Sequence, residues 1–233
     1  MNYKRIIFDM KCDNFLEASK RSISIFNSEG KKIGKLIPVG SWILAESKII
    51  NLLVHWRKRA MRMYMSQFKS TYERTFNYLK NFSIREEGRI FFLLYDDSDN
   101  LIGHIGVADI DGSYSNQPAG INAELDNTMR GIRGGDPHLI YYAAISMLDW
   151  CFKNLGIEKS DLNCLSYNRI AISLYEDIGY KKIENYFLKK YVVNEEILHN
   201  LVNESESNIK YQCIKMDLTK KNFYKKSSWL SSI

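Results

Sequence analysis

The sequence predicts a mixed α/β domain. Two apolar runs, Arg89–Tyr95 and Leu101–Ile110, flank the turn sequence DDSDN and predict a central hairpin. Two strand-and-helix units follow, and they begin with the strands Ile121–Met129 and Lys159–Ser166. An antiparallel hairpin joined to strand-and-helix units excludes a purely parallel, doubly wound sheet.

The N-terminal part of the chain predicts a small hairpin followed by two helices. Ser22–Phe26 and Lys35–Val39 flank the turn sequence NSEGKKIG, and Ser41–Ser47 is a candidate third strand. A helix begins at Ser47, because apolar residues then recur at helical spacing. The sequence STYE, Ser70–Glu73, has the hydroxyl and the carboxylate of a capping box and begins the second helix.

The helices of the two strand-and-helix units have clear end signals. Asp136 can cap the first of them, and Pro137 suits its first position, where a missing N–H costs nothing. Gly156 suits the residue after its end. The second helix runs over Asn168–Ile178 and ends at Gly179.

The chain is expected to close with two strands, Lys181–Val193 and Ile209–Leu218. The polar segment between them, Asn194–Asn208, is expected to be a helical insertion. The chain then divides into an N-terminal hairpin extension (1–45), a main domain (46–219) and a basic C-terminal tail (220–233).

The composition favours a soluble cytoplasmic protein. The net charge of the 233 residues is +6, but lysines and arginines are scattered among acidic residues, so no nucleic-acid partner is expected. No apolar window approaches the roughly 20 residues that span a membrane, and no signal-like run opens the chain. The four cysteines lack metal or redox spacing, which predicts reduced thiols and no metal site.

An arginine- and glycine-rich turn, NTMRGIRGGDPH, leads into the first of the two later helices. A helix N-terminus carries unpaired amides and the positive end of the helix dipole, so it can bind an anion. Glycines let a ligand approach the backbone, and Arg130 and Arg133 add forked donors. Alternatively, the glycines only shape an irregular turn and Asp136 only caps the helix.

The second of these helices favours the anion site. Its sequence YNRIAISLYEDIGYKK resembles the second signature of the GCN5-related N-acetyltransferase (GNAT) superfamily. The matching positions are Asn168, Ala171, Leu174, Tyr175, Glu176, Gly179 and Tyr180. In that superfamily an arginine- or glutamine-led glycine turn, one strand upstream, binds the pyrophosphate of coenzyme A. The resemblance extends from Ile49 to Leu218.

The turn departs from the superfamily pattern R/Q-x-x-G-x-G/A. Counted from Arg130, Arg133 stands where the middle glycine belongs, and Gly135 alone matches. Asp136 also places a carboxylate beside the expected pyrophosphate. These departures leave open a non-catalytic binding module on the same fold.

The resemblance implies a GNAT fold, in which helices cover both faces of a mostly antiparallel, twisted sheet. It also implies acetyl-coenzyme A (acetyl-CoA) as co-substrate, and that a backbone amide near Met129 stabilises the oxyanion. The residues that it places against the coenzyme are Thr128, Met129, Arg130, Gly131, Arg133, Gly134, Gly135, Asp136, His138, Leu139, Asn168, Ala171 and Tyr175. For Asn168, plain helix capping is the alternative.

Acetyl transfer to an amine requires a general base and a proton for the departing thiolate. Glu124 and Asp126 are two apart on one strand face, whereas Asn127 points the other way, and either carboxylate could be the base. His104 is a second candidate. By resemblance, Tyr175 protonates the thiolate. The alternatives are carboxylates that face solvent and a tyrosine that packs in the core.

The acceptor site is expected between the first two helices and the loop Asp111–Gly120. Its candidate contacts are Arg57, Arg59, Arg62 and Tyr114, although the arginines could equally form the solvated face of a helix. The stretches WRK, IGHIG and DNTMRG resemble members that acetylate a nucleotide-linked amino sugar for surface polysaccharides. Aminoglycosides, polyamines and protein N-termini are the alternative acceptors. We also consider a homodimer.

Overall fold

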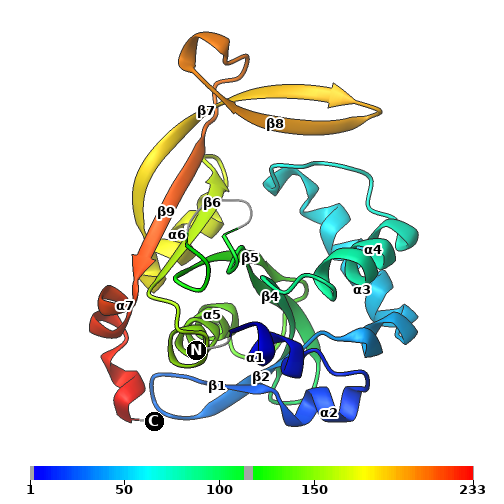
Figure 1. The fold of residues 1–233 in the computed structure, drawn as a ribbon, viewed down its shortest axis with the longest axis vertical. Coiled ribbons are helices and arrows are strands. Elements are labelled where there is room, and N and C mark those ends of the chain that lie inside the picture. The colour runs from blue at the N-terminus through cyan, green and yellow to red at the C-terminus, as the bar shows by residue number, and fades with distance from the viewer. Residues whose placement is uncertain (1–2, 113–117, 233) are drawn as a thin grey trace.

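The computed structural model describes residues 3–112 and 118–232, and a nine-stranded sheet organises them (Figure 1). The strand order is β1-β2-β3-β4-β5-β6-β9-β7-β8. β5 and β6 are parallel, and the other neighbours are antiparallel. The strands are β1 (Ile23–Phe26), β2 (Lys32–Pro38), β3 (Ile90–Asp96), β4 (Leu101–Ala108), β5 (Asn122–Arg130), β6 (Lys159–Leu165), β7 (Lys181–Val193), β8 (Glu196–Val202) and β9 (Cys213–Thr219). The expected mostly antiparallel sheet is confirmed.

Helices cover both faces of this sheet, as the sequence predicted. The helices are α1 (Tyr3–Met10), α2 (Phe15–Lys20), α3 (Ser47–Arg59), α4 (Tyr72–Tyr78), α5 (Leu139–Trp150), α6 (Arg169–Ile178) and α7 (Lys220–Lys226). Residues of α1, α5, α6 and α7 join one apolar cluster, and residues of α2, α3 and α4 join the other. β3 shows why both faces are filled, because its apolar side chains alternate between the two clusters.

The predicted N-terminal hairpin is present as β1 and β2, and β2 pairs with β3 in the main sheet. The helices α1 and α2 precede it and were not anticipated. The candidate third strand is wrong, because Ser41–Ala45 forms a 3₁₀ helix. Trp42 and Ile43 are both buried in the same apolar cluster, and the alternation of a strand would send adjacent side chains to opposite faces.

The expected helical insertion at 194–208 is also wrong for most of its length. β8 (Glu196–Val202) pairs with β7, and a short 3₁₀ turn, Glu204–Glu206, follows. The reversal uses Asn194 and Glu195, which both have positive φ, 49° and 66°. Two such residues make the tight hairpin turn that suits strand twist. The β7–β8 hairpin projects from the rest of the molecule (Figure 1).

Four helix starts match the sequence prediction or depart from it by at most two residues. α3 begins at Ser47, as predicted. α6 begins at Arg169, one residue later than expected, and Asn168 caps it, which was the alternative role considered for this residue. α4 begins one residue later than predicted, because Thr71 rather than Ser70 accepts the capping hydrogen bond. α5 begins at Leu139 rather than at Pro137.

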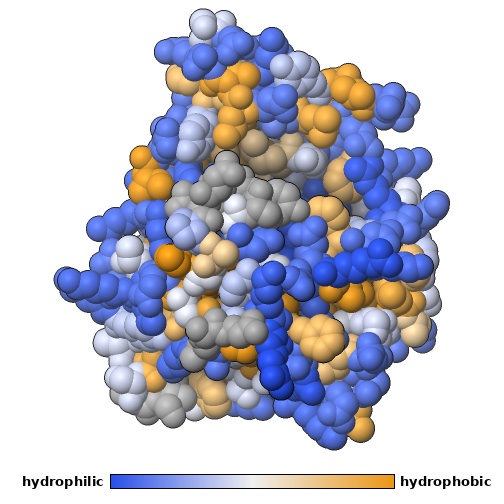
Figure 2. Space-filling view, viewed as in Figure 1, coloured by the Kyte–Doolittle hydropathy of each residue, from blue (hydrophilic) through white to orange (hydrophobic). Residues whose placement is uncertain are grey.

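Residues 220–226, expected as part of a basic tail, form α7. Thr219 caps this helix, and Phe223 is fully buried against Phe152 with 5.2 Å between ring centroids. The face shown in Figure 2 is mainly hydrophilic, with hydrophobic residues in small groups. No helix in residues 3–112 and 118–232 is both long and apolar enough to cross a membrane.

Two irregularities of β5 create the space for a site. The β5–β6 ladder ends at the pair Glu124–Asp161, although β5 continues to Arg130 and β6 to Leu165. Farther along, β5 carries a bulge against β4, in which two residues of β5 lie opposite Ile105. The strands therefore separate just beyond Glu124, and the bulge bends β5 farther along, between Asp126 and Met129.

Candidate active site

A cavity of about 510 Å³ lies where β5 separates from β6. Its walls come from α3, α4, the loop between these helices, and the central strands. Four of the residues singled out from the sequence line it: Arg57, His104, Glu124 and Asp126. The structure therefore brings together the two candidate carboxylates, the candidate histidine and one candidate acceptor contact.

The carboxylate of Asp126 is held by several donors. It accepts the backbone amide and the side-chain amide of Asn127, at 2.7 and 2.6 Å, and it pairs with Arg89 at 3.4 Å. Burial raises the pKa of Asp126, whereas Arg89 and the hydrogen bonds from Asn127 lower it. Because its oxygens are already engaged, Asp126 is better suited to ordering the site than to removing a proton.

Asn127 lines the cavity as well, although strand alternation predicted that it points away from the carboxylates. The reason is the bulge, in which Asn127 adopts φ 51° and interrupts the alternation. Asparagine tolerates this left-handed conformation better than most residues that have a side chain. A single sequence gives no sign of such a bulge, so this contact was missed.

Glu124 has few partners by comparison. Its carboxylate accepts one long hydrogen bond, 3.4 Å, from the side-chain amide of Asn163 on β6. Burial, followed by the nearby charge of Asp126, raises the pKa of Glu124 to about 7. A weakly bonded carboxylate with a pKa near neutrality can accept a proton from a substrate.

His104 lies buried beside the bulge, between the rings of Trp56 and Phe91 at centroid distances of 6.1 and 5.0 Å. Its Nδ1 is 2.6 Å from the carbonyl oxygen of Asn127, and this oxygen can only accept, so Nδ1 carries the proton. Burial lowers the pKa of His104 to about 4. His104 is therefore neutral and fastens the bulge, and it is a weaker candidate for the base than Glu124.

Two further arginines, Arg74 and Arg89, also line the cavity, and neither was predicted from the sequence as a site residue. Arg74 belongs to α4 and stacks on the ring of Phe68 at 3.5 Å. Arg89 precedes β3 and donates to the hydroxyl of Tyr78 at 2.9 Å. Neither arginine belongs to a motif, and they meet only because the fold places α4 over the central strands.

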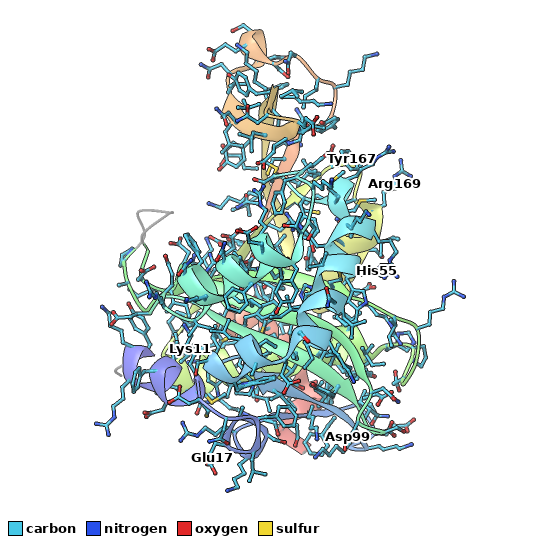
Figure 3. All side chains as sticks on the ribbon, turned by 90° about the vertical axis from the view of Figure 1, so that its right-hand side faces the viewer. Lys11, Glu17, His55, Asp99, Tyr167 and Arg169 are labelled. Atoms are coloured by element: carbon cyan, nitrogen blue, oxygen red, sulfur yellow. The ribbon has the colours of Figure 1, made fainter. Side chains whose placement is uncertain are left out.

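The outer lip of the cavity is tied to the projecting hairpin. Gln67, in the loop between α3 and α4, exchanges two backbone hydrogen bonds of 2.8 Å with Ile197 of β8. Arg74 forms a forked ion pair with Glu196 of the same strand. Tyr167, at the foot of the hairpin in Figure 3, donates its hydroxyl hydrogen bond to a carbonyl of the loop. The hairpin therefore holds one wall of the cavity in place.

The glycine-rich turn after β5 is organised by Arg130. The guanidinium donates to the carbonyl oxygens of Gly134, Asp136 and Pro137. Arg130 therefore fixes the path of the turn backbone through these three hydrogen bonds. Arg133 is exposed on the same turn.

The middle of the turn offers backbone donors. Among the described residues, no partner within the chain accepts the amides of Gly134, Gly135 or Asp136. Gly135 has φ 61°, and a Cβ there would lie 2.8 Å from the Cβ of Asp96, so a side chain is disfavoured. The Asp136 carboxylate instead accepts the amide of His138 at 2.7 Å. Three amides near the start of α5 are thus available for an anion.

Both ends of the turn are anchored. The amide of Gly131 donates to the carbonyl of Ile102 at 2.8 Å, and a Cβ on Gly131 would lie 2.1 Å from the indole of Trp56. Leu139 at the other end is fully buried. The position of the turn is therefore set by packing, and its middle remains open.

The α6 residues have mixed placements. Asn168 caps the helix, because its side chain accepts the amide of Ala171 at 3.4 Å. Tyr175 is 8% exposed and packs edge-on against Tyr180. Burial raises the pKa of Tyr175, so its phenol stays protonated. The buried hydroxyl of Thr128 on β5 interacts with the Tyr175 phenol and opposes part of this rise in pKa.

Three of the expected acceptor contacts do not reach the cavity. Arg59 donates to the carbonyl of Gly131, and Arg62 is exposed, and neither is among the described residues that line the cavity. Tyr114 lies outside the described residues.

Comparison with solved structures identifies proteins of similar fold, whereas comparison of the sequence does not. No family profile and no curated protein matches the sequence. Among solved structures, a GCN5-related N-acetyltransferase from Brucella melitensis superposes with TM-score 0.62 and 14% identity, over 90% of this chain and 85% of that one. FdhC, a nucleotide-linked sugar GNAT, gives TM-score 0.60 and 13% identity over 89% and 96%.

A spermidine N-acetyltransferase from Vibrio cholerae, solved with CoA and spermine, gives TM-score 0.57 and 18% identity over 81% and 96%. The chain therefore has the fold of the GNAT N-acetyltransferases, as the motif of α6 predicted.

Proposed function

We propose that the protein is an acetyl-CoA-dependent N-acetyltransferase that acts on the primary amine of a small acceptor. One observation carries this proposal. Glu124, whose pKa burial raises to about 7, stands in a cavity at the fork between β5 and β6. The GNAT fold of the chain supports the same conclusion.

The chain fits acetyl-CoA at two places. Residues 125–130 of β5 lack a partner on β6, so this strand edge can pair with an extended ligand. At its end, the amides of Gly134, Gly135 and Asp136 suit a pyrophosphate. Thr128 and Met129 would contact the extended arm. Bound there, acetyl-CoA supplies the acetyl thioester.

Glu124 would remove a proton from the ammonium group of the acceptor, directly or through a water molecule. Because its pKa is raised to about 7, an appreciable fraction of Glu124 is ionised at neutral pH and ready to accept a proton. Asp126 and Asn127 would orient the amine, and the contact of His104 with the Asn127 carbonyl keeps the bulge in shape.

The remaining steps involve the acetyl group. A backbone amide near Met129 would stabilise the negative charge that develops on the carbonyl oxygen. Tyr175 would give its phenolic proton to the departing sulfur. Burial raises the pKa of Tyr175, and the proton is therefore present at neutral pH.

The acceptor that we favour is an amino sugar linked to a nucleotide. The cavity is lined by three arginines, Arg57, Arg74 and Arg89, and by two carboxylates, Glu124 and Asp126. Arg74 pairs with Glu196 and Arg89 with Asp126. The choice of acceptor therefore depends on Arg57, which forms no ion pair among the described residues. A polyamine carries several positive charges, which arginines repel. The negative charges of a phosphate-bearing acceptor are instead attracted by an arginine. The polyamine remains the second candidate, because two carboxylates and the fold of a spermidine acetyltransferase favour it.

Acetylation assays with purified protein test this choice. We expect amino sugars on nucleoside diphosphates to be acetylated, and the same free sugars to react with a kcat/KM at least ~100-fold lower, because binding energy from the remote part is lost. Mass spectrometry of the products identifies the N-acetyl group. Preference for spermidine over every phosphate-bearing amine would contradict the acceptor assignment.

We further propose a cytoplasmic location, which the free thiols of Cys12, Cys151, Cys164 and Cys213 support. A homodimer is also proposed. The β7–β8 hairpin exposes Val192 and Leu201, at 68% and 55%, and such side chains on a projecting hairpin can pack against a second copy.

A further inference from the structure

Arg57 of α3 is a partly buried cation in the wall of the cavity. Its guanidinium lies 3.3 Å from the ring centroid of Tyr64 and 4.9 Å from that of Phe68. One hydrogen bond, 2.9 Å, joins it to the carbonyl oxygen of Ser66. These neighbours hold the guanidinium in place but do not neutralise its charge.

The other two arginines of the cavity have carboxylate partners, and Arg57 does not. Arg74 pairs with Glu196 and Arg89 pairs with Asp126. Among the described residues, no carboxylate oxygen lies within ion-pair distance of Arg57. The charge of Asp126 acts on Arg57 from a distance, but Asp126 is paired directly with Arg89. Burying a cation without a direct ion pair is unfavourable, and a binding site commonly explains such an arrangement.

Two donors of the cavity lining also lack partners. The Nε of Arg57 and the hydroxyl of Ser70 are buried, and no acceptor in the described part of the chain reaches either of them. Ser70 is 6% exposed and belongs to the loop between α3 and α4. Buried donors without partners are rare in folded proteins, and a ligand with several acceptor oxygens would satisfy both.

We propose that Arg57, assisted by Ser70, binds an acidic group of the acceptor, a phosphate or a carboxylate, while Glu124 faces its amine. This inference rests on the proposed function, because it assigns the cavity to the acceptor. The ring faces of Tyr64 and Phe68 fix the plane of the guanidinium, which favours forked binding of the anion. The amides of Gly134, Gly135 and Asp136, which would hold the pyrophosphate of the coenzyme, are not among the described residues that line this cavity.

Titration calorimetry with inorganic pyrophosphate and, separately, with malonate tests this site. Saturating coenzyme A is present throughout to occupy the amides before α5. We expect pyrophosphate or malonate to bind the wild type, and Arg57→Met to weaken the tighter of the two by about 10- to 100-fold, the usual value of a charged hydrogen bond. Ser70→Ala should weaken it by about 2- to 10-fold. The tighter anion identifies the acidic group.

Lys58→Met is the matched control, because Lys58 is the next residue of the helix, carries the same charge and is exposed. It should change the dissociation constant less than twofold. If Arg57→Met does not fold, Arg57→Lys keeps the charge and should still weaken binding, since a lysine loses the fork. Equal weakening by Arg57→Met and Lys58→Met would overturn the inference, and so would anion binding unchanged by either Arg57 variant.

The titration separates this inference from the proposed function. If no amine is acetylated but Arg57→Met alone abolishes anion binding, the function is wrong and the anion site stands. If amines are acetylated and Arg57→Met leaves both anion binding and KM for phosphate-bearing acceptors unchanged, the enzyme stands and the anion site is wrong.

Discussion

Glu124→Gln is expected to lower kcat/KM by about 100- to 10,000-fold, the usual contribution of a general base. Glutamine keeps the shape of the side chain and can still bond to Asn163, but it cannot accept the proton of the ammonium group. Steady-state kinetics with a saturating acetyl donor measure the loss. Activity within a few-fold of the wild type would exclude Glu124 as the base.

The pH dependence follows from the pKa of the same carboxyl group. The base must be ionised, so kcat/KM of the wild type should fall below pH of about 7, the pKa to which burial raises Glu124. This acidic limb should disappear in Glu124→Gln. In Asp126→Asn, the matched control two residues away, the limb should remain but move to lower pH, because removing the charge of Asp126 lowers the pKa of Glu124. A limb that persists in both variants would place the base elsewhere.

The stability of the Glu124 variant provides an independent check of the same pKa. The folded state binds the proton of Glu124 more tightly than the unfolded state, so ionisation destabilises the fold as pH rises from the unfolded pKa to about 7. Glu124→Gln should therefore be at least as stable as the wild type at pH 8. Loss of activity without loss of stability would separate a catalytic role from a structural one.

Tyr175→Phe is expected to lower kcat by about 100-fold or more while leaving the dissociation constant of coenzyme A nearly unchanged. The ring packs against Tyr180 with 5.9 Å between centroids, and phenylalanine preserves this packing. The substitution removes the phenolic hydroxyl, and with it the acidic proton and the interaction with Thr128. Single-turnover kinetics and a coenzyme titration measure the two quantities separately.

The leaving group distinguishes an acid from a packing residue in this experiment. An acetyl thioester of a more acidic thiol needs less help from a proton donor, so it should restore most of the activity of Tyr175→Phe. Equal defects with both thioesters would show that Tyr175 does not protonate the sulfur. Unchanged turnover with acetyl-CoA would lead to the same conclusion.

Much of the fold could be predicted because its signals are local. The strands on either side of DDSDN, the start of α3 at Ser47 and the helix end at Gly179 all depend on neighbouring residues. The placement of Glu124 and Asp126 on one cavity-facing side followed from the period of a strand. These features require no knowledge of distant contacts.

The missed features depend on contacts that are distant in sequence. Arg74 meets Glu196 across 122 residues, and the sequence contains no sign that α4 and β8 adjoin. The sequence of β8 does not predict a strand, because its polar residues hide the alternation. The segment becomes a strand through its backbone pairing with β7. Asn127 faces the cavity because a bulge interrupts β5. Such features arise from tertiary packing rather than from propensity.

The glycine-rich turn was partly predictable from local signals and partly set by contacts that the sequence does not show. Its place before α5 followed from the order of elements, and Gly135 does occupy a conformation that favours glycine. The role of Arg130 did not follow. Its guanidinium holds three carbonyl oxygens of the turn, so the available donors in the middle of the turn are backbone amides. This arrangement leaves a place for an anion despite the arginine at 133.

Isothermal titration with acetyl-CoA and, separately, with S-acetylpantetheine is the most direct test of the central claim. We predict that acetyl-CoA binds, and that the shorter compound binds at least about 10-fold more weakly, because it lacks the pyrophosphate that the amides of Gly134–Asp136 would hold. Absence of acetyl-CoA binding would contradict the account and would leave the chain as a binding module on the GNAT fold.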